Sequence, residues 1–463
     1  MAWQIKRRRL RIWAALLVVG IAAGAGGYIA LDRMAQARAE EAIAQMRQRL
    51  PEGTRLAYSS LDASVISQSA TLNAAVLRRG EQQLRAAKVT IGGVTETDGG
   101  NLRAGRIDAD NVTARHPNGL RLAAARVELR DVLMSPTGDA LRSLGRARVS
   151  TLSLTKGDAE LRATDLGLRG ATPRRLGRFS AGIIEMRGLA ADTADREVFR
   201  NVTLQGLKLS PIPPPDRWTA LDPGEVAGIA ADLSYDALRM GKAELHRAGK
   251  RRLLVRGLES SQTREGDRRI WQTGVDHFAA HASRTGPTMA RLVDDSGMLR
   301  GRFSGRQVYD VAAGTLTLKD MALEITDAGR LSGTMQFAGL PTGAQGFMPG
   351  RTSLAQAKLA ALDVTFADKG VLKPALDALA AQQGVSREEL IDRRLGAIDR
   401  KARDASEPVQ ASVHALRRFL NEGGTLHVTM DPEREVAMSK AMMAFVFQPV
   451  RTAEAMNLRI ARK

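Results

Sequence analysis

Four stretches of the chain repeat one pattern and decide its fold. They read AKVTI at residues 87–91, GRIDADNV at 105–112, ARVELRDV at 125–132 and ARVSTLSL at 147–154. A small residue is followed two positions later by an aliphatic residue, and another apolar residue stands close behind. Alternation of this kind places the apolar side chains on one face of a β-strand. The central residues recur about every 20 positions, a spacing that two short strands and two turns would fill: Val89, Ile107, Val127 and Val149.

The same pattern extends over a longer region, from Arg55 to Leu209. Turn signals separate the apolar runs at residues 97–100, 117–119 and 137–139. Two residues often separate the apolar pairs, and such a slip reverses the face unless a β-bulge absorbs it. No long helical pattern interrupts the region, which argues against a βαβ fold. We therefore expect a repetitive, mostly antiparallel sheet with one apolar and one polar face.

The N-terminal stretch Ile12–Leu31, IWAALLVVGIAAGAGGYIAL, contains no charged residue. As a helix it would be ~30 Å long and would match a bilayer core. The basic residues at positions 6–9 and 11 predict that the tip stays in the cytoplasm and that the remainder is exported. A signal peptide cleaved after small residues near Ala23–Gly27 and a buried core helix are the alternatives. The apolar run continues past those small residues, which favours the uncleaved anchor.

The C-terminal part combines strands with helices. Residues 314–340, GTLTLKDMALEITDAGRLSGTMQFAGL, predict three consecutive strands. Val371–Gln383 has a helical pattern, Ser386 with Glu389 forms a capping box, and the helical region continues to Phe419-Leu420 with a break near Glu407-Pro408. The last predicted elements are a strand at 426–430, a helix at 436–446 and a strand at 456–460.

The fold class predicted is β-rich α+β: a transmembrane helix, an elongated repetitive sheet, and a C-terminal helical segment that closes with two short strands. The predicted order of segments is a basic tip at 1–11, the transmembrane helix at 12–31, a helical stalk at 32–52, a first β block at 53–209, a proline-rich linker at 210–223, a second β block at 224–368 and the C-terminal segment at 369–463.

Composition restricts the classes of function. The chain has no cysteine, which excludes disulfides and thiolate chemistry. Lys and Arg number 69 against 50 for Asp and Glu, a formal charge of +19. This charge would attract anionic lipid surfaces or other acidic envelope material, or it forms a solvated arginine-rich surface. Aromatic residues are only 4% of the chain, so we do not expect nucleic-acid binding.

No residue set predicts a reaction, and we expect no enzyme, no cofactor and no metal. His277 and His281 would share a helix face, but no Glu follows His277 as in HExxH zinc proteases. Ser153 and Lys156 match SxxK without the companion motifs of penicillin-binding enzymes. Asn111 and Asn201 begin N-x-T sequons inside the repeats.

The organisation resembles YdgA-like and AsmA-like bacterial envelope proteins. Gly53–Leu72, GTRLAYSSLDASVISQSATL, is similar to the start of their repeated region, and Leu362–Gly370 followed by Phe419–Leu426 is similar to the YdgA-like tail. AsmA-like relatives form elongated sheets whose concave apolar face is thought to hold lipid acyl chains. The resemblance implies the same architecture here and little about mechanism.

We therefore predict a single-pass protein of the bacterial inner membrane, with a periplasmic body that binds or guides a lipid or lipid-like molecule. The expected partners are the inner membrane, a phospholipid or other lipid, and envelope proteins. The residues predicted to face lipid are Val89, Ile91, Ile107, Val112, Val127, Leu129, Val149, Leu152 and Leu154. The alternative for these residues is a closed core. The alternative function is a structural or assembly factor of the envelope that acts through protein partners, with the helices of Val371–Leu420 as the binding module. A third reading, a hydrolase, would need a polar pocket that no motif indicates.

Overall fold

The computed structural model describes residues 53–64, 68–97, 100–135, 141–190, 194–208, 234–282, 296–340, 357–437 and 448–463, together with residues 37, 40, 41, 43, 44, 293, 443 and 444. The chain divides into two compact units, Met1–Lys250 and Arg251–Lys463. The predicted anchor Ile12–Leu31 and the predicted linker at 210–223 lie outside the described residues. Within those residues, no helix has both the length and the apolarity needed to cross a bilayer.

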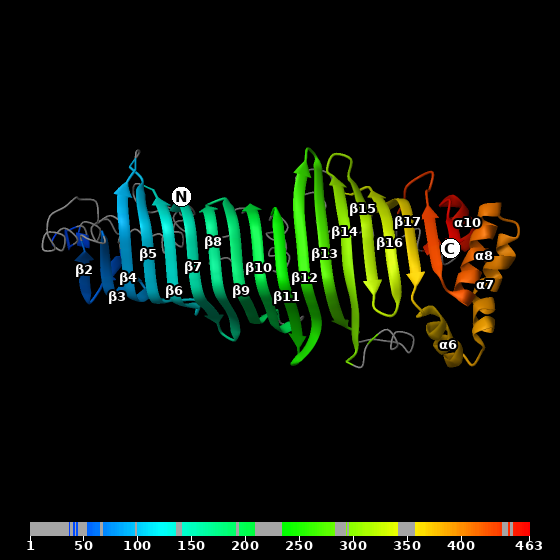
Figure 1. Cartoon of the computed structure of the whole chain (residues 1–463), viewed down its shortest axis with the longest axis horizontal. Coiled ribbons are helices and arrows are strands. Elements are labelled where there is room, and N and C mark those ends of the chain that lie inside the picture. The colour runs from blue at the N-terminus through cyan, green and yellow to red at the C-terminus, as the bar shows by residue number, and fades with distance from the viewer. Residues whose placement is uncertain are drawn as a thin grey trace. The chain divides into compact units, whose positions relative to one another are not determined.

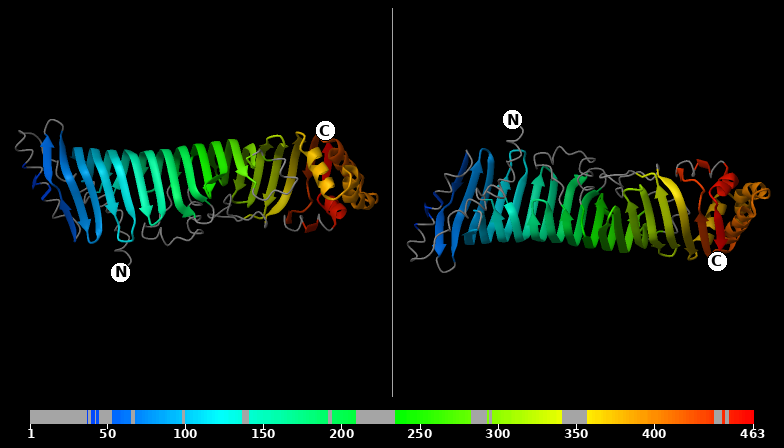
Figure 2. Two further views of the ribbon diagram at one scale, coloured as in Figure 1. Left: turned by 90° about the horizontal axis from the view of Figure 1, so that it is seen from below. Right: turned by 90° about the horizontal axis from the view of Figure 1, so that it is seen from above.

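The first unit is built from strands that run across the sheet in chain order, from blue to green in Figures 1 and 2. Its strands are β1 (Thr54–Ala57), β2 (Ser60–Ser64), β3 (Ser69–Arg79), β4 (Gln82–Glu96), β5 (Leu102–Arg115), β6 (Arg121–Met134), β7 (Leu141–Lys156), β8 (Ala159–Thr172), β9 (Arg175–Ala190), β10 (Ala194–Lys208) and β11 (Ala237–Arg247). From β3 to β11 each strand pairs antiparallel with the next. The predicted antiparallel sheet is therefore confirmed.

The repeat differs from the predicted one in the number of strands it contains. A unit of about 20 residues was expected to hold two short strands, but each of Val89, Ile107, Val127 and Val149 lies on its own long strand. Strands β4 to β10 are 14 to 16 residues long. The slip in the apolar spacing lies inside a continuous strand.

A left-handed backbone conformation absorbs the slip. On β5, Asn111 has φ +51° and separates the apolar-face residues Ala109 and Val112. On β6, Asp131 has φ +52° and separates Leu129 and Val132 in the same way. A residue in this region turns the strand so that the next side chain returns to the apolar face. Asn, Asp and Gly tolerate the conformation best, which explains the residue types found there.

These turned positions line up across the first unit in two rows. In one row alternate strands carry the positive φ, at residues 93, 131, 170 and 206. In the other row β3, β5, β8 and β10 carry it, at residues 74, 111, 165 and 201. The first row comprises Gly93, Gly105, Asp131, Gly145, Gly170, Gly177 and Gly206. Because neighbouring strands turn at the same level, the pairs on either side of a row keep the same register.

Close approach explains the glycines opposite these residues. A Cβ at Gly145 would lie 2.8 Å from the Cβ of Asp131. A Cβ at Gly182 would lie 2.9 Å from Asp165 Oδ2. The turned residue thus fills the space that the partner's side chain would take.

The core of the first unit lies on the apolar face of β3 to β7. Leu72, Val89, Ile91 and Ile107 are at most 1% exposed. Ile43, a helical residue, belongs to the same core with 4% exposure.

The second unit carries the remaining strands and the helices. Its strands are β12 (Lys250–Glu265), β13 (Arg268–His281), β14 (Met298–Asp310), β15 (Thr315–Ile325), β16 (Gly329–Ala338), β17 (Lys358–Asp368), β18 (Thr425–Met430), β19 (Val436–Ala437) and β20 (Arg459–Arg462). Residues 314–340 form two strands rather than three, because Asp320 has φ +51° and turns β15 without ending it.

Four described helices belong to this unit: α6 (Leu372–Gln382), α7 (Arg387–Ala402), α8 (Glu407–Glu422) and α10 (Pro449–Ala455). The first three confirm the predicted helical segment, and the Glu389 amide donates to Ser386 Oγ at 3.0 Å as the capping box requires. Gly423, with φ +68°, follows the end of α8. The predicted helix at 436–446 is wrong at its start, where Val436 and Ala437 form β19 and pair with β17. In Figure 1 the helices gather beside β18, where α8 contacts β18 and β20.

Candidate functional site

The apolar face of the first unit changes from closed to partly open along the sheet. Val89, Ile91 and Ile107 are at most 1% exposed, and Val112 is 6% exposed. The other five residues predicted to face lipid are only half-buried: Val127, Leu129, Val149, Leu152 and Leu154. The residues predicted as one lipid-facing set thus divide between a closed core on β4 and β5 and a partly exposed stripe on β6 and β7.

This stripe is continuous because of the strand register. Val127 lies directly opposite Val149, and Leu152 lies opposite Ala124. Leu154 lies opposite Leu122 on one side and Leu161 on the other. We call Val127, Leu129, Val149, Leu152 and Leu154 the aliphatic stripe.

The opposite face of the same strands carries a row of arginines. Arg106 pairs with Arg130 across β5 and β6, Arg130 with Arg146 across β6 and β7, and Arg146 with Arg169 across β7 and β8. Arg169 then pairs with Arg178 across β8 and β9. Like charges directly opposite each other on neighbouring strands destabilise a sheet. Five consecutive arginines in one cross-strand row therefore need compensation.

Within the described residues, carboxylates compensate the positive charge at only one end of this arginine row. Asp108 forms ion pairs with Arg106 and, at 2.7 Å, with Arg130. Glu128 lies 3.0 Å from Arg126 and 3.9 Å from Arg130. Among the residues that the structure describes, the three arginines at the other end of the row, Arg146, Arg169 and Arg178, form no ion pair, and neither does Arg148, which lies two residues after Arg146 on the same face.

Two further carboxylates on this face, Glu160 and Glu185, are engaged by other arginines. Glu160 pairs with Arg162 at 2.5 Å. Glu185 contacts Arg187 at 2.6 Å and Arg196 at 2.8 Å. The hydrogen bond from Arg196 lowers the pKa of Glu185 despite its partial burial, and Arg187 acts in the same direction. Glu160 and Glu185 are therefore both bound to arginines outside the row.

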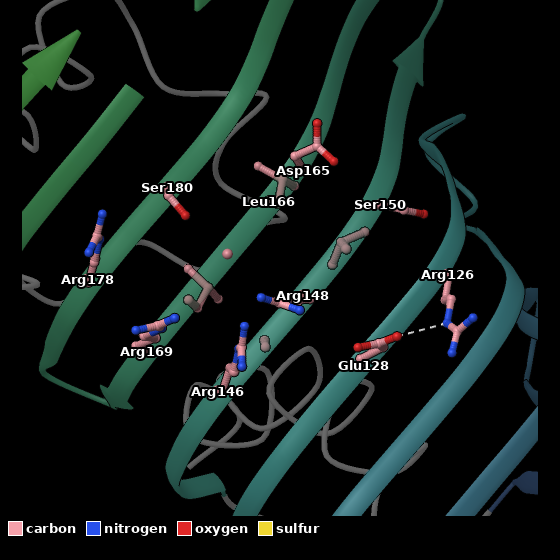
Figure 3. Close-up of a pocket in the computed structure, with 14 residues that line it drawn as sticks. Arg126, Glu128, Arg146, Arg148, Ser150, Asp165, Leu166, Arg169, Arg178 and Ser180 are labelled. Atoms are coloured by element: carbon pink, nitrogen blue, oxygen red, sulfur yellow. Dashed lines mark ion pairs between the residues drawn. The ribbon is translucent and has the colours of Figure 1, made fainter. Parts of the chain in front are cut away.

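The four free arginines surround a shallow cavity of about 450 Å³ (Figure 3). Gly167 lies between Arg148 and Ser180, its partners on β7 and β9, and leaves the floor without a side chain. Arg146, Arg169 and Arg178 lie along one side of the cavity, and Asp165 lies at the opposite side. The volume falls in the range of ordinary ligand pockets. We call Arg146, Arg148, Arg169 and Arg178 the arginine cluster.

The sequence does not reveal this cluster, because its members are separated by 2 to 32 positions and each one alone has the pattern of a solvated surface residue. The usable signal was the register. If neighbouring strands are aligned by their apolar residues, Arg130, Arg146 and Arg169 fall in one cross-strand row.

The two sequence patterns that resemble metal-binding or catalytic motifs do not form a site within the described residues. His277 and His281 both lie on β13, a strand, where four residues span ~13 Å and cannot place both rings on one metal. His281 Nδ1 instead lies 3.0 Å from Arg252 Nη1. Ser153 and Lys156 lie on β7 three residues apart, hence on opposite faces. In the described part of the chain, no group of three or more His, Asp or Glu side chains could hold a metal ion.

The sequons have a structural explanation. Asn111 and Asn201 are both left-handed residues of the turned rows, with φ +51° and +53°. The following valine returns to the apolar face, and the threonine after it continues the strand. The N-V-T spacing therefore follows from strand geometry.

Comparison with known proteins gives little functional information. A family model described only as "Uncharacterized protein" matches residues 322–463, from the middle of β15 to the C-terminus. That range includes the tail on which the YdgA-like resemblance was drawn. No curated protein matches the chain.

Proposed function

We propose that this protein binds or guides a lipid or lipid-like molecule along the aliphatic stripe of its first unit. In this proposal Ile12–Leu31 anchors the chain in a bacterial inner membrane and the β-rich body lies in the periplasm. The protein acts without catalysis in maintenance of the cell envelope. The YdgA-like and AsmA-like resemblance is part of this proposal.

One observation supports it most. Val127, Leu129, Val149 and Leu152 of the aliphatic stripe pack against the closed core, yet all five stripe members stay partly exposed. Exposed apolar surface in a soluble body is unfavourable and commonly marks a binding surface. Aliphatic side chains without aromatic rings suit an acyl chain, which offers dispersion contacts and no polar group.

The test is native mass spectrometry of the full chain extracted in a mild detergent. We expect co-purifying lipid with the unmodified protein and its loss in a Val127→Gln, Leu152→Gln double variant. Ser153→Gln is the matched control, because Ser153 neighbours Leu152 on β7 but faces the other side. Circular dichroism verifies that each variant keeps its β content. Absence of lipid from the unmodified protein, or equal loss from the control, would contradict the proposal.

Crosslinking separates this function from the alternative. Stable capture of one envelope protein through α6 to α8, without any lipid adduct on β6 or β7, would favour an assembly factor.

A further inference from the structure

We propose that the arginine cluster on β7, β8 and β9 binds a ligand with two or more closely spaced phosphoryl groups. The cluster lies on the face opposite the aliphatic stripe. This site is therefore independent of the proposed lipid-binding function, and either can fail without the other.

The register places the cationic groups at one strand spacing from each other. Arg146, Arg169 and Arg178 occupy directly opposite positions on three consecutive strands. Opposite residues of an antiparallel pair lie about 5 Å apart at Cα, so three guanidinium groups rise along a line of ~10 Å. Arg148 stands beside Arg146 on the same strand and face, two residues on. Figure 3 shows these side chains around the same hollow.

The floor of the hollow is shaped by a glycine. A Cβ at Gly167 would lie 2.6 Å from Ser180 Oγ, so any side chain there would displace the serine. Gly167 thus allows the Ser180 hydroxyl to lie over the backbone of β8. The hydroxyl of Ser180 lies at the floor as a further donor for an oxygen ligand.

The electrostatics favour an anion of high charge. The four free guanidinium groups carry four positive charges. Within the described residues, Asp165 is a carboxylate of the cavity lining that forms no ion pair. Glu128, Glu160 and Glu185 are held by other arginines. Repulsion between opposite arginines persists until a ligand neutralises it. One phosphate ester carries a charge of about −1.5 to −2 at neutral pH, so two such groups match the cluster.

The side-chain chemistry favours phosphoryl oxygens. A guanidinium group donates in a planar fork that fits phosphate in a bidentate manner. Each phosphoryl group offers three oxygens and can bridge two neighbouring arginines, whereas one carboxylate is filled by a single fork. The same chemistry could come from a soluble polyphosphate or from phosphorylated lipid headgroups, and the experiment distinguishes these sources.

The test is calorimetric titration of the full chain in neutral detergent with tripolyphosphate at constant ionic strength. We expect saturable binding to the unmodified protein. An Arg146→Gln, Arg169→Gln double variant should bind about 100-fold more weakly, since each lost charged hydrogen bond is worth roughly a factor of 10 or more. Arg162→Gln is the matched control, because Arg162 lies on β8 on the same face but pairs with Glu160.

Three results would overturn the inference: no saturable binding, equal weakening by Arg162→Gln, or unchanged binding in the double variant. The source is identified by doping the micelles with phosphatidic acid, against the same amount of phosphatidylcholine. Weaker apparent affinity for tripolyphosphate in the doped micelles supports a headgroup ligand. Unchanged affinity supports a soluble one.

Discussion

The two units bend their strands in different ways. In the first unit, neighbouring strands turn at the same level, and the pairs on both sides of a turn keep one register. In the second unit, the pairings of β13 to β16 shift register inside the strands, between Val275 and Phe278, Ser304 and Arg306, and Leu318 and Met321. The first unit therefore has matched turns, and its register shifts lie near strand ends, at Leu133/Met134 and Ala194/Arg196. Strands β13 to β16 have β-bulges inside the strands.

This difference determines what each face presents. Matched turns keep residues of one kind in line across many strands, which produces both the aliphatic stripe and the arginine row. Shifted pairings in the second unit accompany mixed charges, as in Glu324, which pairs with Arg302 and Lys369. Its core is also aromatic, with Tyr309 fully buried and Trp271 and Phe337 beside it. A unit with matched turns can thus carry long rows of chemically similar side chains on one face, whereas the shifted pairings of the second unit accompany mixed charges.

The largest effect is expected from glycines at close strand contacts. Gly333 on β16 has φ +150°, and a Cβ there would lie 2.1 Å from the carbonyl oxygen of Asp363. Gly333→Ala should lower the free energy of unfolding by about 3 to 5 kcal/mol, through strain and overpacking. Gly182→Ala in the first unit, where the contact is a side chain at 2.9 Å, should cost about 1 to 3 kcal/mol.

Hydrogen exchange measured strand by strand reports the two losses separately. The control is Gly266→Ala in an open turn, which should cost about 1 kcal/mol of backbone strain alone. A Gly333→Ala variant as stable as Gly266→Ala would show that the strands are farther apart than described.

The next effect concerns the turned rows of the first unit. Asn111→Val places a β-branched residue at φ +51° and should cost about 2 kcal/mol, whereas Asn111→Gly should be nearly neutral. Thr113→Val, two residues further along the extended strand, is the control. Thermal unfolding followed by circular dichroism compares the three. Equal stability of the valine and glycine variants would mean that β5 is not turned at Asn111.

The mixed charges of the second unit predict a dependence on acid. Hydrogen bonds from Lys369 and Arg302 lower the pKa of Glu324 from 4.5 to about 2. A lowered carboxyl pKa contributes stability that is present above pH 4.5 and is lost as the pH falls through 2. Glu324→Gln should flatten this part of the stability profile, while the exposed Glu265→Gln should leave it unchanged. An unaltered profile in Glu324→Gln would show that the ion pairs do not persist in solution.

The smallest effect has the opposite sign. Arg169→Gln removes a charge that faces Arg146 and Arg178, so it should raise stability at low salt by about 0.2 to 1 kcal/mol. Added salt should reduce the gain by screening. Arg162→Gln, which breaks an ion pair, should not stabilise. Denaturant unfolding at two salt concentrations measures both, and destabilisation by Arg169→Gln would contradict the description of unpaired charges.

The sequence predicted the antiparallel sheet and its apolar residues because alternation is a local signal. It did not predict strand length, since the left-handed Asn111 and Asp131 break the alternation without ending the strand. Residues 315–325 were predicted as two strands because Asp320 breaks the alternation in the same way. A left-handed Asn, Asp or Gly followed by an aliphatic residue is the signal that would have corrected it. The arginine cluster depends on which residues of neighbouring strands lie opposite each other, and a local sequence pattern does not carry that information.

The two-faced first unit is tested most directly by a photoreactive amino acid placed at position 152 or 153 of the full chain in bacterial membranes. The two positions are adjacent on β7 and differ only in the face they occupy. We expect illumination to attach lipid at position 152 and not at position 153, as read by mass spectrometry of the labelled peptide. Equal labelling at both positions, or none at position 152, would contradict the assignment of the aliphatic face to lipid.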